Sequence, residues 1–167
     1  PPEPAAAQVS DADFMGGVIR RMVHDIANPL AAAQMLAEDG DPLLQQSIAR
    51  VADLLALYRA IFGGNPADAI DSAALWRRLA AAIEPATLTL ELAAETPPPK
   101  LKAAAALVLA TAGRGPVRLH IGEDCAIHLT AERPRQRQDE SSLAFAALLN
   151  GTLVRLSADP LELRSGG

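Results

Sequence analysis

The sequence has little cysteine, few aromatic side chains and no excess of basic charge, and each scarcity excludes a class of protein. A single cysteine, Cys125, excludes a disulfide framework and a zinc site built from cysteines, and it fits a reducing compartment. The 15 Lys and Arg residues are outnumbered by 20 Asp and Glu residues, which gives a net charge of −5. Such a balance argues against a large contact with a phosphate backbone, so we expect no nucleic-acid partner.

Long hydrophobic runs are also missing from the sequence. No apolar stretch reaches the roughly 18 residues that a membrane-spanning helix needs. Residues 1–10 lack both the basic and the apolar region of a signal peptide, and they read as a disordered Pro/Ala arm. We therefore expect a cytoplasmic protein with no membrane partner.

Alanine and leucine supply most of the apolar mass. The 167 residues include 35 Ala and 24 Leu, against three Phe, one Trp and one Tyr. This composition can bury a core, but the core is one of slim helices packed closely together and not one anchored by large aromatic rings.

The first part of the chain reads as two helices and a boundary. A helical pattern runs from Asp11 to about Glu38, and the turn residues Asp39 to Pro42 stop it and start a second helix. That helix runs from Pro42 to about Phe62, where the breakers 63–66 follow. We therefore expect a disordered arm over 1–10, a helical hairpin over 11–66 and a second domain over 67–167.

The second domain alternates helical and strand patterns, so the fold class predicted for the whole chain is α+β. Three helices are expected, over residues 71–83, 100–112 and 140–149. Strands are expected over residues 87–92, 116–121, 125–130 and 152–156.

Both helices of the hairpin carry an apolar stripe with the 4-3 spacing of a helical bundle. The stripe of the second helix is Leu44, Ile48, Val51, Leu55, Tyr58 and Phe62. Apolar flanks at Met22, Leu54 and Ile61 would remain exposed on a single hairpin. We therefore predict a homodimer in which two hairpins form a four-helix bundle. The alternative is that the second domain covers the hairpin.

The residues best suited to chemical reaction cluster around His24 in the sequence. A helical wheel places His24, Asn28 and Arg21 on the face away from the apolar stripe, and Asp25 can hold the imidazole in one tautomer. Pro29 lies inside the helix, at a cost of about 3 kcal/mol, which suggests a kink kept for function. The outward face is also unusually small or apolar, which indicates a docking surface for another protein. Its members are Gly17, Ala31, Ala32 and Met35.

The segment His24-Asp25-x-x-Asn28-Pro29-Leu30 resembles the H-box of sensor histidine kinases, the signature of their dimerising, phospho-accepting helix. The end of the second helix, residues 57–63, is similar to the "R-x-A-F-G" ending of the alphaproteobacterial histidine phosphotransferases of the ChpT type, although Ile61 departs from it. The layout of the whole chain is also similar to that family. The resemblance implies a dimeric four-helix bundle followed by a degenerate, ATPase-like α/β sandwich.

The resemblance also implies roles for residues and partners. His24 is the phospho-acceptor, assisted by Asp25 and Asn28, and it relays a phosphoryl group between the aspartates of two receiver domains. Mg²⁺ belongs to the partner receiver domain, and no cofactor or metal is expected in this chain. Arg20 and Arg21 can neutralise the phosphoryl group, and Pro29, Gly17, Ala31 and Met35 belong to the docking face.

The second domain lacks the residues with which a histidine kinase binds ATP. The helix over 100–112 has no Asn for the metal, and residues 130–134 replace a D-x-G-x-G box. Residues 138–142 have no glycine to cradle phosphates, and the acids Asp139 and Glu140 there would repel a triphosphate. These losses favour a phosphotransferase that does not phosphorylate itself.

Two other functions stay open. The chain could be an active histidine-kinase core that uses ATP, or a non-catalytic module that sequesters a receiver domain. A metal site at His120, His128 and Cys125 would lack a fourth ligand. The basic loop of Arg133, Arg135 and Arg137 stands where a kinase has its nucleotide lid, and it could instead meet an acidic receiver surface.

Overall fold

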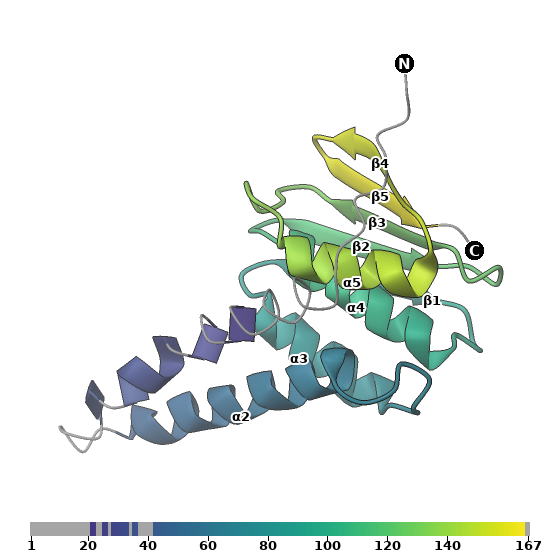
Figure 1. The fold of residues 1–167 in the computed structure, drawn as a ribbon. Helices are drawn as coiled ribbons and strands as arrows, with labels where there is room; N and C mark the ends of the chain where they lie inside the picture. The colour runs from purple at the N-terminus through teal and green to yellow at the C-terminus, as the bar shows by residue number, and fades with distance from the viewer. Residues whose placement is uncertain (1–20, 23–24, 27, 34, 37–41, 166–167) are drawn as a thin grey trace.

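The fold is mixed α+β, with a helical hairpin that projects from a layered domain (Figure 1). The computed structural model describes residues 21–22, 25–26, 28–33, 35–36 and 42–165. The described residues between 21 and 36 are helical and run beside α2 (Leu43–Phe62). In this described part no helix has both the length and the apolar character to cross a membrane.

A five-stranded sheet forms one layer of the domain, in the order β1-β2-β3-β5-β4. Its strands are β1 (Thr87–Leu92), β2 (Pro116–Ile121), β3 (Ile127–Ala131), β4 (Leu153–Ala158) and β5 (Leu161–Ser165). β1 and β2 are parallel because a helix connects them, and the other neighbours are antiparallel. Alternate side chains of β2, β3 and β5 are buried, so one face of the sheet meets the core and the other is polar.

The helices of the domain lie on the buried face of that sheet (Figure 1). They are α3 (Ser72–Ala82), α4 (Pro98–Thr111) and α5 (Glu140–Asn150). Every residue of α4 from Leu101 to Thr111 is buried, because α4 packs on β2 and β3 and is also contacted by α2, α3 and α5. The run Ala103–Ala106 is fully inaccessible and lets these neighbours approach closely.

Most predicted elements agree with the structure to within two residues. Asp71 caps the start of α3, where its side chain accepts a hydrogen bond from a backbone N–H of the first turn. β1 and β2 have the predicted bounds. α4 begins two residues earlier than predicted because proline is tolerated in a first helical turn. α2 begins at Leu43 and not at Pro42. β3 begins at Ile127 and not at residue 125, because Cys125 takes a φ of 60° in the turn.

The structure adds a strand that the sequence pattern does not predict, β5, and it extends β4 two residues beyond the predicted end. Asp159 and Pro160 turn the chain back, so that β4 and β5 form a hairpin, and β5 inserts between β3 and β4. The alternation Leu161-Glu162-Leu163-Arg164 places both leucines in the core. β4 is an edge strand with a bulge between Arg155 and Ser157, and its burial does not alternate regularly.

The predicted burial of α2 is corrected by the structure. Leu54 and Ile61, expected as exposed flanks, are buried with Leu57 because α3 and α4 pack against this face. Ile48 and Leu55, expected in the buried stripe, are 54% and 39% exposed. The second domain therefore covers the end of the hairpin near it and leaves apolar side chains exposed farther along.

Candidate functional site

Three residues expected at the site, namely His24, Gly17 and Arg20, lie outside the described residues. The structure does place Asp25 and Arg21, on either side of His24 in the sequence, and it shows what holds them. Their spacing of four residues puts both side chains on one face of the helix, where Arg21 Nε donates to Asp25 Oδ2 over 2.8 Å.

Tyr58 of α2 is a second hydrogen-bond donor to Asp25. Its hydroxyl donates a short hydrogen bond to the same oxygen, Asp25 Oδ2. Burial raises the pKa of Tyr58 well above its usual range, and the hydrogen bond to Asp25 adds to the rise. Tyr58 is therefore a neutral donor at any physiological pH, and it fixes Asp25 against the second helix of the hairpin.

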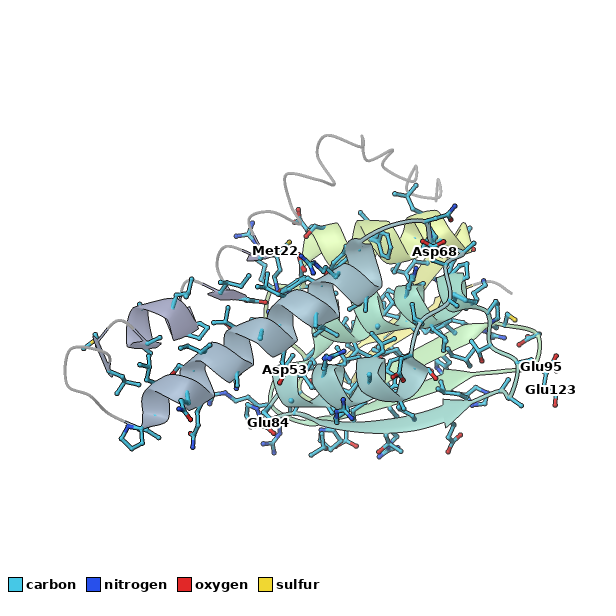
Figure 2. All side chains as sticks on the ribbon, turned by 90° about the horizontal axis from the view of Figure 1, so that it is seen from below. Met22, Asp53, Asp68, Glu84, Glu95 and Glu123 are labelled. Carbon is cyan, nitrogen blue, oxygen red and sulfur yellow. The ribbon has the colours of Figure 1, made fainter. Side chains whose placement is uncertain are left out.

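Arg21 joins this pair to the second domain. Its Nη1 donates to Asp139 Oδ2 over 3.0 Å and its Nη2 donates to the carbonyl oxygen of Leu109 over 3.3 Å. The Arg21 side chain is 10% exposed, so the expectation that it lies on the outer face is wrong. Burial alone would lower the pKa of Arg21, but Asp25, Tyr58 and Asp139 together outweigh it and the pKa is raised. In Figure 2 the neighbouring Met22 lies close to the start of α5.

Asp139 is the N-cap of α5, and this role fixes the position of its carboxylate. Its side chain accepts from the backbone N–H of Ser141 and from the hydroxyls of Ser141 and Ser142. Burial would raise the pKa of Asp139, but these hydrogen bonds and Arg21 together lower it below the usual value. Asp139 is thus ionised and pairs with a cation from the hairpin.

The loop before α5 is fastened to the end of α4. The backbone N–H groups of Arg135 and Asp139 donate to the carbonyls of Thr111 and Ala110, and Arg135 Nε donates to the carbonyl of Ala112. Burial lowers the pKa of Arg135, and the positive charge of Arg21 adds to the effect. These bonds occupy the carbonyl groups at the end of α4.

Gly113 permits this close approach. A Cβ at that position would lie 2.1 Å from the carbonyl oxygen of Arg133, which is closer than any side chain allows. The loop from Arg133 to Asp139 therefore packs directly on the backbone that follows α4.

The remaining expected site residues lie toward the surface. Asn28 and Ala31 are exposed, Met35 is 71% exposed and Pro29 is half-buried. Asn28, Ala31 and Met35 are therefore accessible in the single chain. The structure separates them from the inward pair Arg21 and Asp25.

Sequence reasoning missed three members of the cluster that surrounds Asp25. The sequence predicts Tyr58 in the core stripe, Asp139 as a group that would repel a triphosphate, and Arg135 in a solvated loop. One signal was present, since Asp139 precedes Ser141 and Ser142 at a helix start as an N-cap. The contact from Arg21 to Asp139 spans 118 positions, and no local pattern predicts it.

His120 and His128 lie opposite each other on β2 and β3, on the polar face of the sheet. His128 Nε2 lies 2.6 Å from Glu162 Oε1, and His120 Nδ1 lies 3.4 Å from Glu91 Oε2. Among the described residues no group of three or more metal-ligating side chains is assembled.

Comparison with known proteins assigns no family to the chain. No protein-family profile matches it, and a search of curated proteins gives no significant match.

Proposed function

We propose that this protein is a histidine phosphotransferase of a phosphorelay, in which His24 receives a phosphoryl group from one receiver domain and gives it to another. The observation that carries this proposal is the fixed carboxylate of Asp25, the residue that follows His24 in the sequence. Asp25 is held by Arg21 and Tyr58 on the helix that bears the His-Asp-x-x-Asn-Pro-Leu segment. Asn28, Ala31 and Met35 remain accessible on this helix, as the approach of a partner requires.

The proposed transfer is an in-line displacement. A neutral nitrogen of His24 attacks the phosphorus of the receiver's aspartyl phosphate, the P–N bond forms, and the P–O bond to the aspartate breaks. The leaving aspartate keeps the bonding electron pair, and the imidazole ring gains positive charge, which a carboxylate at Asp25 stabilises. Mg²⁺ on the receiver neutralises the phosphoryl oxygens. The reverse reaction with a second receiver completes the relay.

The second domain supports a phosphotransferase over an ATP-dependent kinase. From Ala103 to Thr111, α4 presents alanine, leucine, valine and an internally bonded Thr111 where a kinase needs a metal ligand. The loop 133–139 is bonded to the end of α4, and Arg21 pairs with Asp139. We propose that this domain is a degenerate ATPase-like sandwich that binds no nucleotide.

A homodimer through the hairpin is part of the proposal. Leu30, Leu43, Ile48 and Leu55 are each at least 39% exposed in the single chain, and all belong to the hairpin. A second copy packed on them would remove this apolar surface from water and form a four-helix bundle. The residues that face the partner then differ from those that face the second domain.

Incubation with a phosphorylated receiver domain tests this function, with phosphorylation of His24 as the expected result. Radiolabelled ATP separates the rivals, because an active kinase core would label His24 with no partner present and a phosphotransferase would not. A non-catalytic module would bind the receiver in both the wild type and H24A, yet move no phosphate in either.

A further inference from the structure

A pocket of about 420 Å³ opens beside the end of α2, where the chain leaves the hairpin for α3. Its walls come from the last turn of α2, the linker that follows and the first part of α4. Two cations line it, Arg59 from α2 and Lys102 from α4, together with one carboxylate, Asp68. In Figure 2, Asp68 lies in the loop beyond the end of α2.

Lys102 is a buried cation with few partners. The residue is 2% exposed, and its Nζ donates to the carbonyl oxygen of Asn65 over 2.9 Å. An ammonium group has three N–H donors, and the described part of the chain provides Lys102 with this one acceptor and no carboxylate. A buried charge without a counter-ion is strongly unfavourable, so an anion in the adjoining pocket would stabilise it.

Arg59 adds a second cation with free donors. It is exposed, and its guanidinium has no partner among the described residues. A guanidinium presents a planar fork of donors that fits the oxygens of a phosphate or a carboxylate. Arg59 and Lys102 come from different elements, so an anion between them would join α2 to α4.

The negative charge of Asp68 would repel an anion, but its carboxylate already accepts a hydrogen bond. Its Oδ2 accepts from the backbone N–H of Asn65 over 3.1 Å, which turns the carboxylate toward its own loop. The three charged groups leave one net positive charge on the pocket. The remaining wall includes Ile70 and Ala69, so the pocket can also hold an apolar group attached to the anion.

We propose that this pocket binds the phosphate group of a small molecule, with Lys102 and Arg59 as its ligands. Lys102 supplies the buried charge, Arg59 closes over the outer oxygens, and the apolar wall receives an organic substituent. This binding site shares no residue with the proposed phosphotransfer site and needs no phosphorelay chemistry.

Calorimetric titration of the whole chain with inorganic phosphate and with phenyl phosphate tests the proposal. We expect saturable binding of both, with phenyl phosphate the tighter because its ring reaches the apolar wall. The variants Arg59→Gln and Lys102→Met should each weaken binding at least tenfold. Asp68→Asn, which keeps an acceptor for Asn65 and removes the charge, should tighten it.

Arg77→Gln is the matched control, because Arg77 is an exposed arginine of α3 outside the pocket. It should bind phosphate as the wild type does. Since Arg59 is exposed, we expect Arg59→Gln to keep the fold. Circular dichroism checks whether Lys102→Met is folded. Absence of saturable binding by the wild type, or unchanged affinity in both Arg59→Gln and Lys102→Met, would overturn the proposal.

Discussion

At the scale of single residues, Arg21 connects the proposed reaction centre to the rest of the molecule. One guanidinium contacts Asp25 on its own helix, Asp139 at the start of α5 and the carbonyl of Leu109 at the end of α4. Both carboxylates are mostly buried, so these are charge-assisted hydrogen bonds in a poorly solvated place. The hairpin therefore cannot turn relative to α5 without breaking them.

The variant Asp139→Asn tests this connection through the pH dependence of stability. The folded state lowers the pKa of Asp139, so ionised Asp139 stabilises the fold above its unfolded pKa of about 3.9. That contribution is lost as the pH falls below this value. At pH 7 we expect urea denaturation to show a loss of about 2 kcal/mol in the variant.

The difference between the wild type and Asp139→Asn should shrink as the pH falls from 5 toward 3, because protonated aspartic acid and asparagine are both uncharged. A difference that stays constant over this range would contradict an ionised Asp139 in the pair. Glu123→Gln, an exposed change in the turn between β2 and β3, serves as the control and should leave stability unchanged.

At the scale of elements, α4 is held by close packing and by the loop 133–139 that precedes α5. α4 is buried along its length by close packing of alanine, and the loop 133–139 is bonded to its end. Side chains and backbone of the chain itself therefore fill the space around α4.

The variant Gly113→Ala tests the close approach of this loop. A Cβ at residue 113 would collide with the carbonyl of Arg133, so the loop must move away and lose its bonds to α4. We expect a loss of about 3 kcal/mol in the free energy of unfolding, measured by denaturant titration. Gly151→Ala is the comparison, since its Cβ meets nothing within 4 Å and its cost comes from backbone strain alone, at a φ of 81° and a ψ of −47°, about 2 kcal/mol. An equal loss in the two variants would argue against the collision.

The sequence predicted elements well where a local signal was strong. Asp71 before an apolar helix and the alternation in β1 and β2 each report on their own neighbours, so their bounds follow from a few residues. The face that α2 buries could not be predicted in this way. Leu54 and Leu55 are equally apolar, and the packing of α3 and α4 decides that Leu54 is buried and Leu55 is not.

In the candidate site, too, residues within one short segment could be predicted and contacts between distant elements could not. Asp25 and Asn28 were found because they belong to a short segment around His24. Tyr58, Asp139 and Arg135 come from other elements and meet Arg21 or Asp25 only after the chain folds. The Lys102 pocket was missed for a similar reason, because a lysine inside an alanine-rich helix gives no sign that it is buried.

At the scale of the whole molecule, the hairpin has one end packed on the second domain and one end that projects (Figure 1). The exposed apolar side chains of the projecting part are the proposed contact with a second copy. Ile48→Asp places a charge in that contact, so we expect a monomer by light scattering where the wild type is a dimer. Val154→Asp, on the edge strand β4, is the control, because Val154 is 52% exposed and Ile48 is 54% exposed. A dimer that survives Ile48→Asp but not Val154→Asp would move the interface to the sheet.

The central claim is that His24 carries a phosphoryl group, and its most direct measurement is transfer from a radiolabelled, phosphorylated receiver domain to the chain. We predict label on the wild type that is lost in acid and kept in base, as a phosphohistidine requires, with none on His24→Ala. The Arg77→Gln control should be labelled as the wild type is. Absence of label from the wild type, or equal label on His24→Ala, would contradict the account.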